Sequence, residues 1–204
     1  MALTKYNNNS LSNLTALPAS IPTGKLKFIS SQTASNSASI SFTSGLTSTY
    51  KIYSFVFSNI VNATDGVSFK FNLSTDSGSN YNVTKTSTMF DVANQESDAS
   101  QQFYYNTGRD LAQSTSDAWI SSDCDNQSDS SLNGTLTLFN PASTTYVKHW
   151  ISVVNAVGDG GTNYSWGNYG AGYGNTTSAI NAIKFNFASG NISAGKIYLY
   201  AIEN

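Results

Sequence analysis

The stretch Val67-Ser-Phe-Lys-Phe-Asn-Leu-Ser74 decides the fold class of this chain. Apolar residues occupy its odd positions and polar residues its even positions, so an extended backbone would carry one apolar face and one polar face. The next six residues, Thr75-Asp-Ser-Gly-Ser-Asn80, are typical of a turn. The alternation then resumes over residues 81–88. We therefore predict two strands joined as a hairpin over 67–88.

Similar alternating runs occur along the rest of the chain, and Gly, Asn or Pro lies near their ends. They lie at 25–30, 38–43, 50–58, 132–139, 146–154, 179–187 and 195–202. About eight to ten short strands without a helix of three turns predict an all-β fold, an antiparallel two-sheet sandwich of the jelly-roll type over residues 25–204. We expect a buried core between the sheets, some of whose members would face a subunit interface instead: Phe69, Phe71, Val83, Leu136, Leu138, Val147, Ile151, Ile183, Phe185, Ile197 and Leu199.

The composition narrows the classes of function. Charged residues make up 11% of the 204 residues and the net charge is −2, so the chain has no basic footprint for nucleic acid. The chain has no run of about 18 apolar residues, so we expect no membrane-spanning segment. It also lacks the apolar h-region of a secretory signal. The single cysteine, Cys124, excludes an intrachain disulfide framework. We expect a protein made in a cytoplasm.

Residues 1–24 follow neither a helical nor a strand period and contain two of the three prolines. A solvated tail is one interpretation. The alternative is an extended N-terminal attachment arm, because Leu11, Leu14, Leu17 and Ile21 would give it apolar surface to bury, whereas solvated tails are usually poor in such residues. We predict the arm.

Two segments interrupt the strand pattern. Residues 91–131 hold eight of the twelve acidic residues, and we expect short strands near 101–107 and 117–121 between exposed loops. Residues 155–175 contain seven glycines and predict a Gly-Tyr-Asn contact loop. Four aromatic residues of that loop could stack on sugar rings, although packing inside the loop is the favoured interpretation: Tyr164, Trp166, Tyr169 and Tyr173.

The candidate catalytic residues are isolated. His149 has no second histidine and no acid within two residues, so we interpret it as a half-buried strand histidine. Cys124 lies between Asp123 and Asp125, whose carboxylates would raise the pKa of the thiol and make it unreactive. We therefore predict no catalytic residue and no cofactor.

The acidic run Asp123 to Asp129 resembles a calcium loop in its spacing of oxygen ligands. It departs from that loop where the sixth and twelfth positions require Gly and Glu, because Ser128 and Gly134 stand there. A solvated acidic loop is the expected structure, with a weak cation site as the alternative. Acidic pairs such as Glu96 with Asp98 would be needed for glycoside hydrolysis, but no strand places them in a cleft.

Several segments resemble a family of virion-associated β-sandwich proteins of aquatic bacteriophages, cyanophages and pelagiphages among them. They are Ser74-Thr-Asp-Ser-Gly-Ser-Asn-Tyr-Asn82, Leu138-Phe-Asn-Pro-Ala-Ser-Thr-Thr-Tyr-Val-Lys-His149, Gly172-Tyr-Gly-Asn-Thr-Thr-Ser-Ala-Ile-Asn-Ala-Ile-Lys-Phe185 and Gly190-Asn-Ile-Ser-Ala-Gly-Lys-Ile-Tyr-Leu-Tyr200. The leader, with Ile21-Pro-Thr-Gly-Lys25, resembles an N-terminal module of phage structural proteins. The resemblance implies a non-catalytic jelly roll assembled on a particle, often as a trimer. It assigns no role to the acidic loop, which lies in a part that varies within the family.

The expected function is accordingly a non-enzymatic virion protein, exposed on the particle surface after assembly in the host cytoplasm. A capsid decoration or cement protein fits the small size and the apolar arm, with the major capsid protein as its partner. A tail-associated fibre or adhesion protein that binds host-surface glycan is the alternative, favoured by the aromatic loop. A carbohydrate-active enzyme or free lectin is a third hypothesis. Strand 196–202 carries bulky groups on both faces, which also favours the homotrimer.

Overall fold

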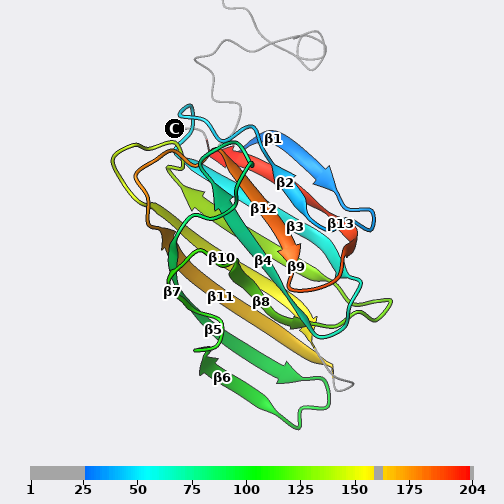
Figure 1. The fold of residues 1–204 in the computed structure, drawn as a ribbon. Coiled ribbons are helices and arrows are strands. Elements are labelled where there is room, and N and C mark those ends of the chain that lie inside the picture. The colour runs from blue at the N-terminus through cyan, green and yellow to red at the C-terminus, as the bar shows by residue number, and fades with distance from the viewer. Residues whose placement is uncertain (1–25, 159–162, 203–204) are drawn as a thin grey trace, which may run out of the picture.

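The computed structural model describes residues 26–158 and 163–202, and the expected arm at 1–24 lies outside them. Thirteen strands in this part of the chain form two antiparallel sheets, packed as a sandwich of the jelly-roll type (Figure 1). None of the residues in these two ranges forms a helix long and apolar enough to cross a membrane.

The large sheet has the strand order β1-β13-β3-β9-β10-β11-β5-β6, and β7 pairs with β5 beside β6. Its strands are β1 (Leu26–Thr33), β3 (Ile52–Asn62), β5 (Lys85–Gln95), β6 (Gln101–Tyr105), β7 (Leu111–Ser114), β9 (Leu132–Phe139), β10 (Lys148–Gly158), β11 (Tyr164–Gly174) and β13 (Ile192–Ile202). The small sheet has the order β2-β12-β4-β8. Its strands are β2 (Ile40–Phe42), β4 (Val67–Ser74), β8 (Ala118–Cys124) and β12 (Ala182–Phe187).

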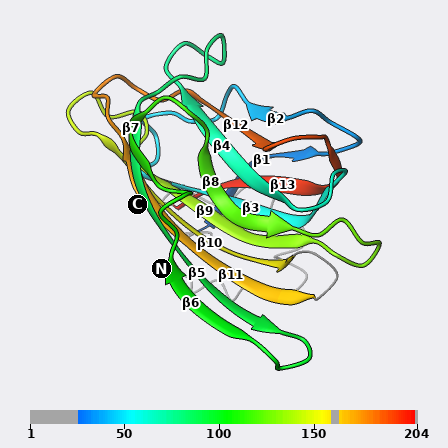
Figure 2. The same cartoon turned by 60° about the horizontal axis from the view of Figure 1, so that its bottom comes forward.

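The small sheet covers only part of the large one. The region around β5 and β6 extends past it at one end (Figures 1 and 2). There, the inner side of β5 meets polar side chains of β8 and of the loop after β6: Asn106 Nδ2 and Ser122 Oγ each donate a hydrogen bond to Asp91 Oδ2, at 2.8 Å. Arg109 continues this layer with an ion pair to Asp123. Polar contacts therefore join β5 to β8 and to the loop after β6 at that end of the sandwich.

The hairpin expected over 67–88 is wrong. The turn lies where the sequence predicts it, but it carries the chain from β4 in the small sheet to β5 in the large one. Both edges of β4 are already paired, with β12 on one side and β8 on the other. The returning chain therefore makes only one backbone hydrogen bond to β4, from Val83 N to the Leu73 carbonyl at 3.5 Å, before it crosses.

Aromatic side chains from both sheets meet in the core around Phe185 of β12. The ring of Phe185 lies 5.2 Å from that of Phe55 and 5.3 Å from that of Phe57, measured between centroids, and Phe69 stacks on it at 6.0 Å. Nine of the eleven expected core residues are buried. Val147 is only half-buried. Ile151 is 50% exposed, because β10 turns Trp150 inward, where its ring meets that of Phe71 at 4.9 Å.

Candidate functional site

The glycine-rich segment expected to be a loop over 155–175 is mostly strand. It contains the end of β10 and all of β11, which pair along their full length. The glycines of β11 make room for a large side chain on the inner side of the sheet. A Cβ at Gly170 or Gly172 would lie 3.2 or 2.8 Å from the Trp150 ring. The strand thus keeps its pairing where bulky residues would collide with tryptophan.

The four candidate aromatic residues of this segment do not share one surface. Tyr164 and Trp166 lie on the strand face that also carries the buried Asn168, and their rings are 5.7 Å apart. Tyr169 and Tyr173 point to the opposite side, away from the small sheet, because residues an odd number of positions apart face opposite ways on a strand. The prediction of a single four-residue contact loop is therefore wrong, and two of its members remain on the exposed side.

The side of the large sheet that faces away from the small sheet carries most of the exposed large apolar side chains of the described residues. We call it the outer face and define it by the outward positions of β9, β10, β11, β5 and β6. At its centre, Tyr169 and Phe90 stack with ring centroids 4.9 Å apart, and Phe90 meets Phe103 at 5.7 Å. Val153 is the cross-strand neighbour of Tyr169 and is 44% exposed, while Phe103 is 74% exposed.

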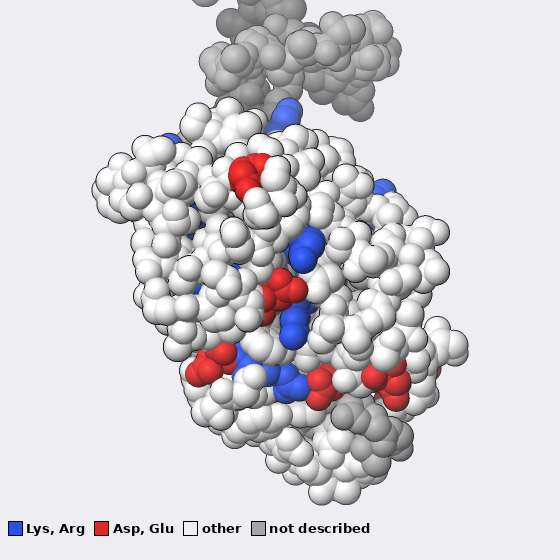
Figure 3. Space-filling view, in the orientation of Figure 1, with Lys and Arg blue, Asp and Glu red and all other residues white. Residues whose placement is uncertain are grey.

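The outer face carries no Lys, Arg, Asp or Glu at these outward positions, which all lie in the described ranges. The polar ones are Asn133, Thr135, Thr137, His149, Asn155, Ser165, Thr86, Thr88, Asn94 and Gln101. The opposite side of the molecule differs. Charged side chains gather in the middle and lower part of the small-sheet side (Figure 3). The two sides therefore present different chemistry to a partner.

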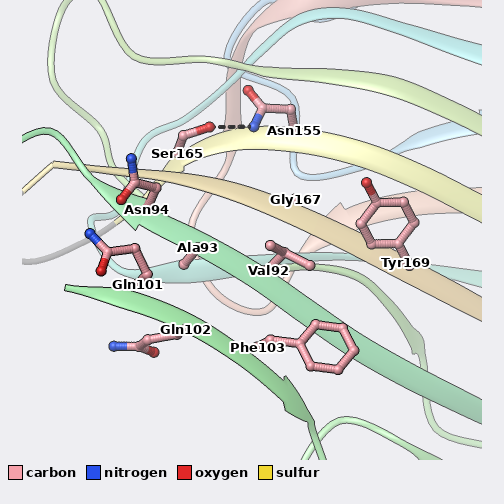
Figure 4. Close-up of a pocket in the computed structure, with 10 residues that line it drawn as sticks. All are labelled: Val92, Ala93, Asn94, Gln101, Gln102, Phe103, Asn155, Ser165, Gly167 and Tyr169. Carbon is pink, nitrogen blue, oxygen red and sulfur yellow. Dashed lines mark hydrogen bonds between the residues drawn. The ribbon is translucent and has the colours of Figure 1, made fainter. Parts of the chain in front are cut away.

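Two shallow grooves cross the outer face. The first, of about 630 Å³, has Tyr169 and Phe103 at one end, Gly167 in its floor, and the amides of Gln101, Gln102 and Asn155 farther along (Figure 4). The Asn155 amide is held by a hydrogen bond from its Nδ2 to Ser165 Oγ at 3.0 Å. A second groove of about 480 Å³ lies on the other side of Tyr169. Its lining includes His149, Ile151, Ala171 and Tyr173.

These grooves offer apolar ring faces and neutral amide groups. No group of three His, Cys, Asp or Glu side chains suited to a metal ion occurs among the described residues. The arrangement can therefore hold a neutral surface, such as another protein or an uncharged sugar, through apolar contact and amide hydrogen bonds.

The structure changes the interpretation of His149 and, in part, that of Cys124. His149 shares its side of β10 with Ile151 and Val153, as predicted, but that side is the outer face, so His149 is exposed instead of half-buried. Burial, more than the neighbouring Asp123, raises the pKa of the Cys124 thiol to about 12. The direction of that prediction is confirmed, and its main cause is different.

The solvated acidic loop expected around Asp123 to Asp129 is only partly present. Arg109 Nη2 lies 2.7 Å from Asp123 Oδ2. Asp125 is buried and accepts hydrogen bonds from Ser130 Oγ and from the backbone N–H of Gln127, both at 3.2 Å. The carboxylates of Asp123 and Asp125 therefore hold β8 and the turn after it, while Asp129 is exposed, as expected of a solvated loop.

The outward residues Phe90, Val92 and Phe103 are not among those predicted from the sequence. The sequence of β10 indicates the apolar outer face to which they belong, because apolar side chains occupy both faces of this strand: Trp150 and Val154 inward, Ile151 and Val153 outward. A strand that is apolar on both faces indicates that both faces meet protein.

Comparison of the chain with models of protein families, with curated proteins and with solved structures found no match.

Proposed function

We propose that this chain is a non-enzymatic structural protein of a bacteriophage particle that assembles through its outer face. The observation that carries the proposal is the width of this uncharged, apolar surface. Monomeric proteins rarely expose contiguous apolar patches larger than a few hundred Å², and larger ones mark interaction sites. The segments that resemble virion-associated β-sandwich proteins support the choice of a phage particle.

The outer face is large enough for a stable protein contact. Strands β9, β10, β11, β5 and β6 have 8, 11, 11, 11 and 5 residues. At about 3.3 Å per residue and about 4.8 Å between strands, they cover roughly 730 Å² of sheet. That area is close to the ~800 Å² that each partner contributes to a standard interface. Because the face is uncharged, identical copies can meet there without repulsion. We therefore propose a second copy of the chain as its occupant, within a homotrimer.

The edge strand β6 favours the same kind of assembly. Among the described strands it pairs only with β5, and its sequence Gln101-Gln-Phe-Tyr-Tyr105 has no charge and no proline. Soluble proteins usually protect such edges with lysine, proline or a bulge, since an open edge pairs readily with another strand. An unprotected edge beside an apolar face is consistent with burial in an assembly.

Within the particle we propose the exterior of the capsid, where the chain would act as a decoration or cement protein on the major capsid protein. Cryo-electron microscopy of the intact particle would locate it. In the isolated chain, Val153→Asp would place a carboxylate on the outer face and is expected to convert a trimer to a monomer in sedimentation analysis. Tyr146→Asp is the matched control, since Tyr146 is 67% exposed in the loop before β10, outside the outer face.

Incorporation of the two variants into phage particles tests the proposal. We expect Val153→Asp to be lost from purified particles and Tyr146→Asp to remain at the parent's occupancy. Particles that carry the Val153→Asp variant at full occupancy would contradict assembly through this face. A chain absent from purified particles would contradict the virion role altogether.

A tail-associated adhesion protein that binds host-surface glycan is the second candidate. The groove of Figure 4 favours it, because Tyr169 and Phe103 offer ring faces beside three amide side chains. Tyr169→Ala should then abolish binding of host polysaccharide in calorimetry. Neither candidate hydrolyses its ligand, so incubation should release no reducing ends. Release that disappears when one carboxylate is replaced would instead support an enzyme.

A further inference from the structure

A lysine amine is buried where the chain crosses from the small sheet to the large one. Lys85, the first residue of β5, is fully buried. Its Nζ donates hydrogen bonds to Asn72 Oδ1 and to the Val83 carbonyl, both at 2.6 Å. Both acceptors are neutral, and within the described ranges Lys85 takes part in no ion pair. A buried ammonium without a counter-ion is costly, so this contact calls for a chemical explanation.

The side-chain amide of Asn72 is held on all sides. Its Oδ1 also accepts the backbone N–H of Leu73 at 2.9 Å. Its Nδ2 donates to Asp117 Oδ1 at 2.8 Å and to the Thr115 carbonyl at 3.0 Å. The three side chains come from β4, from the start of β5 and from the segment before β8 (Figure 1), so only the fold brings them together. The Cγ of Asn72 is one bond beyond the oxygen that the amine contacts.

The surroundings favour a reactive amine. Burial lowers the pKa of Lys85 to about 8, an effect that nearby Asp117 opposes and nearby Lys184 adds to. A neutral amine, unlike an ammonium, carries the lone pair needed to attack a carbonyl carbon. Near neutral pH a useful fraction of the side chain is therefore in its nucleophilic form.

We propose that Lys85 and Asn72 form an intramolecular isopeptide bond between Nζ and Cγ, with Asp117 as the proton carrier and ammonia as the leaving group. The inference concerns chemistry within one chain and does not depend on the proposed function.

The reaction balances without a co-reactant. The lone pair of the neutral amine forms the Nζ–Cγ bond, and the carbonyl electrons move to Oδ1, where the N–H of Leu73 stabilises the negative charge. The Asp117 carboxylate takes a proton from Nζ and passes it to Nδ2, because both nitrogens are then bonded to the same carbon. The Cγ–Nδ2 bond breaks, the carbonyl re-forms and ammonia leaves. Nothing is oxidised or reduced, and Asp117 ends as a carboxylate.

The bond would tie β4 of the small sheet to β5 of the large sheet. It replaces a buried cation by a neutral amide and closes a covalent ring over residues 72–85. A cross-link of this kind also restricts the unfolded chain, as a disulfide does. The single cysteine of this protein cannot form an intrachain disulfide. The isopeptide bond would supply that restraint by other means.

Mass spectrometry of the denatured chain tests the proposal directly. We expect the intact mass to be lower than the sequence mass by one ammonia. Asparagine can also lose ammonia by forming a succinimide, so the cleavage pattern decides. Trypsin cannot cut after an acylated lysine, and the linked protein should yield one peptide, 71–109, lighter by one ammonia. Separate peptides 71–85 and 86–109 would overturn the proposal.

Variants assign the roles. Lys85→Met and Asn72→Ala should both show the full mass of their sequences. The matched control is Lys148→Met, because Lys148 is equally buried but its amine contacts only the backbone carbonyls of Tyr146 and Thr176. It should keep the mass loss. Asp117→Asn should slow bond formation at least ~100-fold, the usual share of general acid–base catalysis. If the bond forms at the parent rate in Asp117→Asn, the role of Asp117 is wrong.

Discussion

Replacing Phe185 by alanine removes the ring on which the aromatic core is centred. Phe185 is fully buried, and rings from both sheets surround it. They belong to Phe42, Phe55, Phe57, Phe69 and Phe71. A buried Phe→Ala change costs ~3–5 kcal/mol, because apolar contact is lost and a cavity remains. Domains have only ~5–15 kcal/mol of stability in total, so we expect a large fractional loss.

Urea denaturation, followed by tryptophan fluorescence, measures the loss in free energy of unfolding, and thermal denaturation measures the shift in Tm. For a domain of this size, each kcal/mol lowers Tm by ~2–4 °C, so Phe185→Ala should melt ~6–20 °C below the parent. Phe185→Leu leaves a smaller cavity, so its Tm should lie between those of the parent and of Phe185→Ala. This variant keeps the test informative if the alanine variant does not fold.

Tyr146→Ala is the matched control, since Tyr146 is 67% exposed in the loop before β10, outside the outer face. Surface changes of this kind usually stay within ±0.5 kcal/mol. We compare the loss in free energy of unfolding in Phe185→Ala with the loss in the control. If the difference is below about 1 kcal/mol, the two sheets are not close-packed around this ring.

Three further predictions concern separate parts of the molecule. Gly172→Ala should destabilise the sheet by ~1–3 kcal/mol in thermal denaturation, because its Cβ would lie 2.6 Å from the Thr86 carbonyl oxygen. Gly108→Ala, whose Cβ would meet nothing closer than 3.6 Å, should melt like the parent. Burial raises the pKa of Cys124 from its ordinary 9.0 to about 12, so the native thiol should resist alkylation that the unfolded chain undergoes. The folded state then holds the proton more tightly, and this contribution to stability should be full below pH 9 and disappear as the pH rises towards 12. Deletion of residues 2–22 should leave the far-UV circular dichroism unchanged and abolish incorporation into particles, and normal occupancy of the truncated chain would contradict an attachment arm.

Period-two alternation was sufficient to predict where most strands and turns lie. Val67 to Ser74 is a strand with its odd positions in the core, because a strand with one apolar and one polar side has only one favourable way to face. The turn after it was also predicted, since Asp, Ser, Gly and Asn favour turn conformations at short range. These are local properties, and a single sequence contains them in full.

The partner of each strand was not predictable in the same way. The turn after β4 suggested a hairpin, yet β4 had its two neighbours from β12 and β8, which are distant in sequence. Likewise, the glycines of β11 by themselves predict a loop. In the structure they lie in a strand and make room for Trp150 of the neighbouring strand. Pairing depends on which edges are already filled, and no short segment records that.

The sequence by itself determined the class of fold, the low charge and the absence of a disulfide framework, since these follow from composition and local periodicity. Only the tertiary structure decided which face of β10 is buried, because both faces are apolar and packing against Phe71 selects Trp150 for the core. The tertiary structure also decided the two proposed sites. The outer face joins side chains of five strands, and the hydrogen bonds of Asn72 with Lys85 and with Asp117 join three segments that share no local pattern. Such sites arise from the register of distant strands, which is a property of the whole fold.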